Sequence, residues 1–300
     1  MSSLVNAKTL QTWIKKDGTG NKDSVVLIDV RWYLTKSPLG RTGREEYEAG
    51  HLPGALFWDL DRDLSAKEGP GRHPLPHRDD VIALLERSGI SKDTRVVGYD
   101  DAGGSIAARL WYVLRRLGHE KVYVLDGGLD AWKREGGALT SDLPAKPLPT
   151  KYVAKEPGVS EPIDKQEVVR AAQRGALLLD ARSPDRYRGE TEPVDARPGR
   201  IPGAVNVPWV TNLSSSKEFL DKVYLLAKYM DILMAPEESS RANLATTEIG
   251  TRETIVYCGS GVTACHVILA MHEAGFKYAR LYEGSYSDWA RDPELRVDRG

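Results

Sequence analysis

Short runs of consecutive apolar residues alternate with longer amphipathic segments along most of the chain. The runs Val25–Val30, Val96–Tyr99 and Leu177–Asp180 contain no polar alternation, which is typical of strands buried on both faces of a parallel sheet. Between such runs, the segment SIAARLWYVLRRLG repeats its apolar side chains with the period of a helix and ends at Gly118. Strands that alternate with helices predict an α/β fold with doubly wound, mostly parallel sheets flanked by helices.

Four segments of the first half recur in the same order in the second half. The pairs are 25–32 with 176–183, 51–60 with 200–209, 95–118 with 254–275, and 122–132 with 279–289. The spacing between the two members of each pair is the length of a whole domain. A polar, proline-rich stretch separates the two halves. We therefore predict a domain at 1–142, a linker at 143–162 and a second domain of the same fold at 163–300.

Composition excludes several classes of function. The chain has 42 Lys and Arg against 43 Asp and Glu, a net charge of -1, so no overall field favours nucleic acid or an anionic membrane as a partner. Two cysteines in 300 residues cannot form a disulfide framework, and no cluster has metal-ligand spacing. No signal peptide or membrane-spanning run is seen. We expect a protein of a reducing, cytoplasmic compartment.

One stretch carries the candidate chemistry: TIVYCGSGVTACHVILAMHEAG, residues 254–275. Cys258 ends a predicted central strand, where ligands bind in α/β sheets. Gly259 and Gly261 can take positive φ and turn successive N–H groups inward as an anion-binding nest. The helix that follows would favour the thiolate over the thiol. The alternative is a buried small side chain that only packs.

With these features, the chain resembles the two-domain rhodanese family of sulfurtransferases over essentially its whole length. The loop Cys258, Gly259, Ser260, Gly261, Val262 and Thr263 looks like that of 3-mercaptopyruvate sulfurtransferases, whereas thiosulfate-specific rhodaneses carry basic residues inside it. The resemblance implies that Cys258 carries the sulfur as a persulfide, without a metal or organic cofactor. Asp100 stands at the matching position of the first domain, which therefore looks non-catalytic. A phosphatase loop is excluded because Ala264 stands where its arginine is required.

Further site residues follow from the same resemblance. A carboxylate-bearing donor calls for a guanidinium clamp, and Arg186 matches one substrate-binding arginine of the family, with Arg197 as the candidate for the second. A Ser-His-Asp set maps onto Ser260, His73 and Asp61, as a proton shuttle to the departing enolate. Each could instead be a solvated loop residue.

Three functional interpretations stay open at this point. The neutral loop favours mercaptopyruvate as donor, while the shortened arginine segment is similar to that of proteins presumed to use thiosulfate. The third interpretation is a module that loads sulfur as a signal without turnover. The expected partners are a small-molecule donor and acceptor, such as cyanide or a thiol, with thioredoxin among the candidate acceptors, and we expect a monomer. Asp29 and Asp180, which end matching strands, are expected to hold loop backbone.

Overall fold

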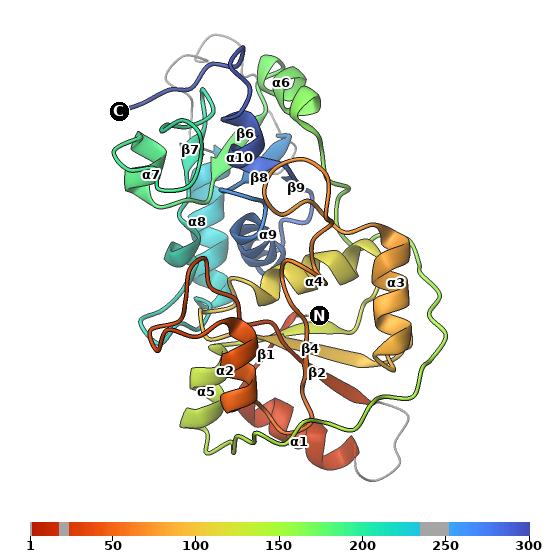
Figure 1. Ribbon diagram of the computed structural model, residues 1–300. Coiled ribbons are helices and arrows are strands. Elements are labelled where there is room, and N and C mark those ends of the chain that lie inside the picture. Colours follow the sequence, from red (N-terminus) through yellow and green to blue (C-terminus); the bar gives the residue numbers. More distant parts are fainter. Residues whose placement is uncertain (1, 18–23, 235–251) are drawn as a thin grey trace. The chain divides into compact units, whose positions relative to one another are not determined.

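The computed structural model describes residues 2–17, 24–234 and 252–300 (Figure 1). The chain forms two compact units. The first is drawn from 1–69, 73–159 and 213–219, and the second from 70–72, 160–212 and 220–300. Each unit thus contains one short segment that interrupts the other in sequence. In the described ranges, no helix has the length and apolar character needed to cross a membrane.

The first unit contains a five-stranded sheet in the order β1-β5-β4-β2-β3. Its strands are β1 (Leu4–Val5), β2 (Val25–Asp29), β3 (Leu56–Phe57), β4 (Arg95–Tyr99) and β5 (Val122–Leu125). All neighbouring strands are parallel. The two apolar runs predicted as strands in this half are therefore confirmed as β2 and β4, which pair with each other at the centre of the sheet.

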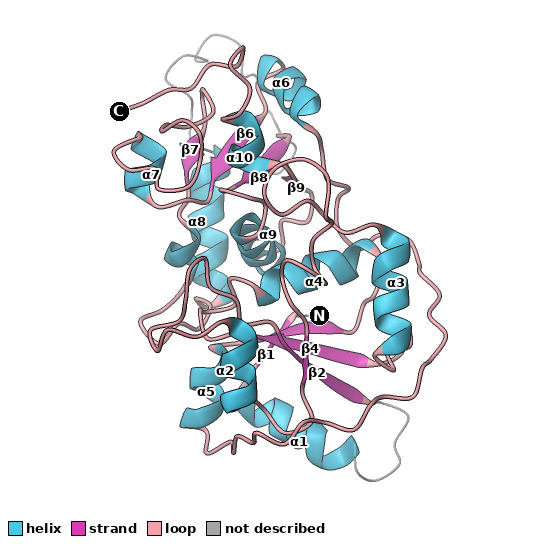
Figure 2. Ribbon diagram, in the orientation of Figure 1, coloured by secondary structure: helices cyan, strands magenta, loops and turns pink. Residues whose placement is uncertain are grey.

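Helices cover both faces of this sheet (Figure 2). They are α1 (Ala7–Asp17), α2 (Gly43–Ala49), α3 (Arg78–Arg87), α4 (Ala107–Arg116) and α5 (Gly128–Arg134). Leu10 of α1 and Trp132 of α5 pack with Val97 and other strand residues into one core cluster. On the other face α4 approaches Gly98 so closely that a methyl group there would lie 3.1 Å from Leu110 Cδ2. The first unit is therefore a three-layer α/β structure.

The second unit repeats this plan with the strand order β7-β6-β8-β9. Its strands are β6 (Leu177–Asp180), β7 (Val205–Asn206), β8 (Thr254–Tyr257) and β9 (Arg280–Leu281), again parallel. Its helices are α6 (Lys165–Gln173), α7 (Pro184–Arg188), α8 (Lys222–Met234), α9 (Thr263–Ala274) and α10 (Ser285–Trp289), with a 3-10 helix at Trp209–Asn212. The order matches β3-β2-β4-β5 of the first unit, so the predicted fold and duplication are confirmed.

One core cluster of the second unit lies on the face of the sheet covered by α6 and α10. Val168 and Ala171 of α6 pack there against Ile255 and Tyr257 of β8, with Trp289 of α10 in the same cluster. Helix α9 contacts β8 and also packs on α8. The central strand β8 is thus buried on both faces, as its run of apolar residues predicts.

An aspartate at the end of each of the matching strands β2 and β6 holds the loop that follows. Asp29 accepts the backbone N–H of Arg31 at 3.0 Å and the guanidinium of the same residue at 2.6 Å. Asp180 and Arg182 repeat this pair, with distances of 3.0 and 2.7 Å. Each guanidinium also donates to a glycine carbonyl further along the chain. The predicted structural role of both aspartates is confirmed, and their arginine partners are an addition from the structure.

Most of the segment predicted as a linker packs against the first unit. The Lys155 N–H donates to the Leu117 carbonyl, and the Gly158 N–H donates to the Arg115 carbonyl, both at 2.8 Å. Tyr152 is buried, and its hydroxyl lies 3.1 Å from His119 Nδ1. Because these backbone groups find acceptors at the end of α4, the chain up to Val159 belongs to that unit.

The buried His119, which contacts Tyr152, makes the stability of the first unit depend on pH. Burial lowers the pKa of His119 to about 4, although a hydrogen bond to the Thr94 carbonyl partly opposes the shift. The unfolded state therefore takes up a proton that the folded state does not. We expect the unfolding free energy of the first unit to have its full value above about pH 6.5. It should fall by about 3 kcal/mol as the pH drops to about 4.

Urea denaturation at several pH values, followed for the wild type and His119→Gln, measures this loss. The variant lacks the titrating group, so its unfolding free energy should fall less steeply over the same interval. Equal slopes for the two proteins would show that His119 is not responsible.

Candidate active site

Cys258 lies directly after β8, and the loop that it begins leads into α9. The strand, loop and helix therefore have the order that the sequence predicts. The thiol is free, and the residue is only 2% exposed. Its placement at the carboxyl end of a central parallel strand is where α/β sheets bind ligands.

Helix α10 fixes the backbone of this loop. The Cys258 N–H donates to Ser285 Oγ at 3.1 Å, and the Cys258 carbonyl accepts the Tyr286 N–H at 2.9 Å. The Ser287 N–H donates to the Gly259 carbonyl at 2.8 Å. Sequence reasoning did not find Ser285, which has a positive φ of 51°. Its counterpart in the repeat, Gly128, has a φ of 53°, so the repeat itself held the signal.

The first unit shows what a loop of this kind can bind. Asp100 occupies the position that matches the cysteine, and it is 1% exposed. Its carboxylate accepts the backbone N–H groups of Ala102 and Gly104 on Oδ1 and of Ile106 and Ala107 on Oδ2, at 2.8–2.9 Å. A strand-to-helix loop of this fold thus forms a cradle of N–H groups around an anion. Cys258 directly follows β8 as Asp100 directly follows β4, so the thiol occupies the position in the repeat that the carboxylate occupies in the first unit.

The two loop glycines serve different purposes. Gly261 has a φ of +78° and uses the left-handed conformation that the sequence allows for both. Gly259 does not, and its lack of a side chain has another reason. A methyl group at Gly259 would lie 2.9 Å from Arg72 Nη2 and 3.3 Å from Arg186 Nη1. Two guanidinium groups therefore approach the residue next to Cys258.

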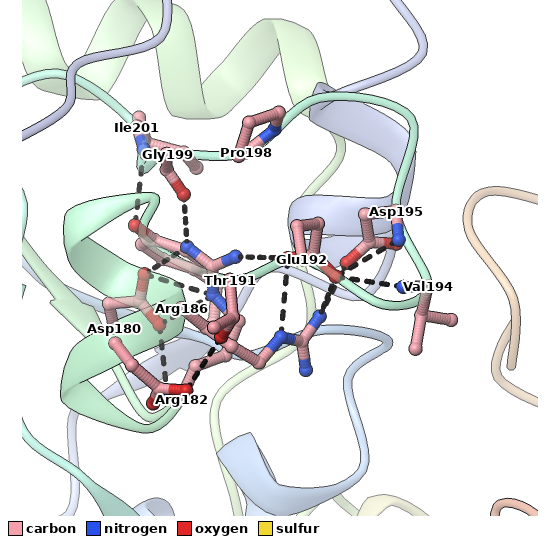
Figure 3. Close-up of polar contacts among 12 residues, drawn as sticks. Asp180, Arg182, Arg186, Thr191, Glu192, Val194, Asp195, Pro198, Gly199 and Ile201 are labelled. Carbon is pink, nitrogen blue, oxygen red and sulfur yellow. Dashed lines mark hydrogen bonds and ion pairs between the residues drawn. The ribbon is translucent and has the colours of Figure 1, made fainter.

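Buried carboxylates hold the guanidinium of Arg186 in place (Figure 3). It donates to Glu192 from Nε at 3.2 Å and from Nη2 at 2.7 Å, and to Asp195 from Nη2 at 2.8 Å. Burial would raise the pKa of Glu192, but the bonds from Arg186 and from the backbone N–H groups of Asp195 and Val194 together outweigh it and hold that pKa below its usual value. Burial raises the pKa of Asp195, which Arg72 and Arg186 only partly counteract. Sequence reasoning found this arginine but missed both acids.

Arg197, the second predicted donor-binding arginine, is turned toward backbone. Its guanidinium donates to the carbonyls of Trp289, Ala290, Asp292 and Leu295 at 2.5–3.3 Å. These carbonyls lie at and beyond the end of α10, where helix carbonyls lack intrahelical partners. The contacts are those of a structural clamp, and they occupy Nε, Nη1 and Nη2.

His73 and Asp61 meet within the first unit. His73 Nε2 lies 3.1 Å from Asp61 Oδ1, and Asp61 Oδ2 accepts the Trp32 indole N–H at 2.8 Å. The Trp32 ring stands edge-on to the imidazole, with ring centroids 5.2 Å apart. The carboxylate is thus positioned to orient the histidine, as the resemblance implies. Their pairing with Ser260 stays a prediction.

Metal ligands are not gathered at these strand ends. Across residues 2–17, 24–234 and 252–300, no group of three or more His, Cys, Asp or Glu side chains is arranged to hold a metal ion. The charged groups that lie beside Gly259 are the guanidinium groups of Arg72 and Arg186, which pair with buried carboxylates. Such a set is suited to binding an anion.

Comparisons with known proteins agree with this arrangement. A model of the rhodanese-like domain matches residues 10–135 and 161–292. The chain belongs to the rhodanese family. A probable 3-mercaptopyruvate sulfurtransferase of Pseudomonas aeruginosa is 39% identical over 93% of this chain and 94% of its own length. The human 3-mercaptopyruvate sulfurtransferase is 35% identical over 96% and 91%.

Solved structures give the same result. The crystal structure of SseA from Escherichia coli, described as a 3-mercaptopyruvate sulfotransferase, superposes with a TM-score of 0.75. It shares 29% identity and covers 96% of this chain and 100% of that one. The predicted family and enzyme class, a sulfurtransferase, are confirmed. Both cysteines of the chain, Cys258 and Cys265, lie in the second of the two matched rhodanese-like regions.

The carboxylate cradle of the first rhodanese unit predicts a stability effect. Asp100→Ala removes the acceptor of four buried N–H groups, so we expect the unfolding free energy to fall by about 3 kcal/mol. Chemical denaturation measures the change, with Asp93→Ala as the control because Asp93 is exposed. Equal effects of the two substitutions would contradict the importance of the cradle.

The structural clamp predicts a different outcome for Arg197 than donor binding would. Arg197→Ala leaves several carbonyls without donors, and we expect a loss of about 2–4 kcal/mol in unfolding free energy. The control is Arg188→Ala, which breaks an exposed pair with Glu190 and should leave the unfolding free energy nearly unchanged. If Arg197→Ala left stability unchanged and raised the KM of the sulfur donor, Arg197 would belong to the donor site instead.

Proposed function

We propose that the protein transfers a sulfane sulfur from 3-mercaptopyruvate, through a persulfide on Cys258, to a nucleophilic acceptor. One observation carries this proposal above the others. The cysteine stands at the loop position whose counterpart, Asp100, has its negative charge held by four N–H groups. A thiolate and the sulfur bound to it need the same stabilisation.

The first half-reaction forms one bond and breaks another. The Cys258 thiolate attacks the sulfur of the donor, so that an S–S bond forms while the C–S bond of mercaptopyruvate breaks. The electron pair of the C–S bond leaves with the carbon as the enolate of pyruvate, which then takes up a proton. Val262 occupies the N-cap position of α9, as Ile106 does in α4. In the first unit the N–H groups of Ile106 and Ala107 bind the Asp100 carboxylate. The N–H groups of Val262 and Thr263 are therefore the candidates to stabilise the sulfur anion.

The second half-reaction returns the enzyme to its starting state. Cyanide, a small thiol or reduced thioredoxin attacks the outer sulfur of the persulfide, and the S–S electron pair returns to Cys258 as thiolate. Covalent catalysis of this kind needs no organic cofactor, because the cysteine itself carries the transferred atom. A cytoplasmic location, where thiol acceptors are kept reduced, belongs to the same proposal.

Other residues are assigned by their chemistry. Arg186 binds the carboxylate of the donor, since its guanidinium lies beside Gly259. Ser260 polarises the carbonyl, and His73 delivers the proton to the enolate while Asp61 orients the imidazole. The hydrogen bond between His73 and Asp61 supports the last of these roles.

Thiosulfate is the second candidate donor. A putative thiosulfate sulfurtransferase of Mycobacterium tuberculosis is 38% identical over 93% of this chain, close to the value for the Pseudomonas aeruginosa protein. The loop GSGVT carries no basic residue, whereas a dianionic donor would gain from one. The uncharged loop therefore favours mercaptopyruvate.

Replacing the nucleophile tests the whole proposal. Cys258→Ser should lower cyanide-dependent sulfur transfer by about a thousandfold or more with either donor, because no persulfide can form. The matched control is Cys265→Ser, a buried cysteine in α9 whose thiol donates to the Gly261 carbonyl, and it should keep most of the activity. Substantial transfer by Cys258→Ser would remove the cysteine from its assigned role.

Kinetics of the wild type then decide the donor. A kcat/KM at least about tenfold higher for mercaptopyruvate than for thiosulfate is expected if a single carboxylate is bound by guanidinium groups. The opposite ratio would make thiosulfate the donor. Loading of Cys258 with sulfur that is released only slowly, seen by mass spectrometry, would indicate a sensing module rather than an enzyme.

A further inference from the structure

We propose that Lys228 is a site of acylation, where the side-chain amine takes an acyl group from a small acyl phosphate or acyl thioester. The residue lies in the second unit, on α8, which packs against α9 (Figure 1). The inference goes beyond the proposed sulfur transfer and does not depend on it. It rests on the set of hydrogen bonds that holds the amine.

Two uncharged oxygens of the 3-10 helix accept the N–H groups of this amine. Lys228 Nζ donates to Thr211 Oγ1 at 2.6 Å and to Asn212 Oδ1 at 2.7 Å. The Thr211 hydroxyl gives its own proton to the Pro208 carbonyl at 2.7 Å, and the amide oxygen of Asn212 has no proton to give. Both oxygens therefore act as acceptors from Lys228, and the direction of each bond is fixed.

These two bonds leave the lone pair of a neutral amine unused. A neutral amine has two N–H groups, and Thr211 and Asn212 accept both of them. The lone pair then takes the remaining tetrahedral direction, away from the two acceptors. Lys228 is half-buried and Thr211 is exposed, so a small molecule can reach the amine from solvent.

The surroundings favour the neutral amine over the ammonium ion. Burial lowers the pKa of Lys228 to about 8, and in the ranges that the structure describes no carboxylate is paired with the amine. Asp231, on the next turn of α8, is exposed to solvent. On α9, the buried His266 meets the other end of the Asn212 amide, with its Nδ1 3.5 Å from Asn212 Nδ2. A desolvated lysine of this kind is a nucleophile near neutral pH.

The neighbouring aromatic side chain also fixes one of the acceptors. The Tyr229 hydroxyl donates to Asn212 Oδ1 at 2.8 Å, and the Tyr229 ring lies 5.4 Å from Lys228 Nζ. Tyr229 is fully buried, and burial raises the pKa of its hydroxyl, which stays neutral. Asn212 is therefore held from two sides, and the amine that it binds is held with it.

Apolar side chains border the exposed side of the amine. Val210, directly before Thr211, is 51% exposed, and Tyr224, one turn before Lys228 on the same face of α8, is 71% exposed. An uncharged acyl group can pack on such side chains. A small acyl donor is therefore the class of electrophile that fits here.

Acylation at this site forms one bond and breaks another. The neutral nitrogen of Lys228 attacks the carbonyl carbon of the donor, so that a C–N bond forms. The C–O bond of an acyl phosphate, or the C–S bond of a thioester, breaks, and its electron pair leaves as phosphate or as thiolate. The nitrogen gives one proton to solvent. The amide product keeps a single N–H, so it can donate to Thr211 or to Asn212 but not to both.

Rates of acetylation at single lysines test the proposal in the wild-type protein. Peptide mass spectrometry follows them with acetyl phosphate and, separately, with acetyl-coenzyme A. At pH 7.5 we expect Lys228 to react about tenfold faster than Lys222, an exposed lysine at the start of the same helix. The rate at Lys228 should be half-maximal near pH 8. Equal rates at the two lysines, or a rate at Lys228 that still rises above pH 9.5, would overturn the proposal.

An isosteric variant tests the role of the uncharged acceptor. Asn212→Asp places a carboxylate beside the amine and holds it as ammonium, so the rate at Lys228 at pH 7.5 should fall about tenfold or more. Thr211→Ser keeps a hydroxyl acceptor and should stay within about twofold of the wild type. The rate at Lys222 reports any general change in the protein. An unchanged rate at Lys228 in Asn212→Asp would contradict the proposal.

The source of the acyl group and the route to Lys228 are separated in the same assay. Reaction with acetyl phosphate or with acetyl-coenzyme A identifies which donor is used, and reaction with neither rejects the site. Cys258→Ser protein should give the same rate at Lys228, because the amine takes the acyl group directly. Loss of acylation in Cys258→Ser would show that the thiol captures the acyl group first, and would reject direct transfer.

Discussion

The backbone N–H groups at the start of a helix need acceptors, and this need organises both units. Where a loop leaves a central parallel strand and enters a helix, several N–H groups have no intrahelical carbonyl to bind. In the first unit the Asp100 carboxylate supplies the acceptor permanently. In the second unit Cys258 stands at that position, so a charged sulfur and its substrate can take the place of a built-in carboxylate. The same constraint yields a structural loop in one half and, in the function that we propose, a reactive loop in the other.

Several backbone contacts of the scaffold around the two loops are repeated in both units. The Leu129 N–H donates to the Asp100 carbonyl, and the Tyr286 N–H donates to the Cys258 carbonyl, each at 2.9 Å. The strand-end pairs of aspartate and arginine are repeated in both units with matching distances. The side chain at the end of the central strand is different, an aspartate in the first unit and a cysteine in the second. A duplicated domain can therefore change its chemistry at one position while its backbone bonds are kept.

The arginines near the second sheet show how acceptors decide the role of a side chain. The donors of Arg182 are used by Asp180, Glu192 and a carbonyl, and those of Arg197 by four carbonyls at and beyond the end of α10. Arg186 pairs with Glu192 and Asp195, and Arg72 with Asp195, but these carboxylates do not engage every N–H donor of the two guanidinium groups. A guanidinium has five donors in a fixed plane, so its function follows from which of them the fold has already used.

The sequence by itself determined the duplicated α/β fold, the central strands and the position of Cys258, because hydrophobic runs, loop glycines and helix periodicity are local signals. It also pointed to Arg186 and to the pairing of His73 with Asp61, through resemblance to a family. Only the tertiary structure decided which other arginines face the loop. Arg72 is separated from Asp195 by 123 residues, and Arg197 lies 92–98 residues before its carbonyl partners. Such pairings depend on how distant segments pack, and no local pattern of residues encodes them.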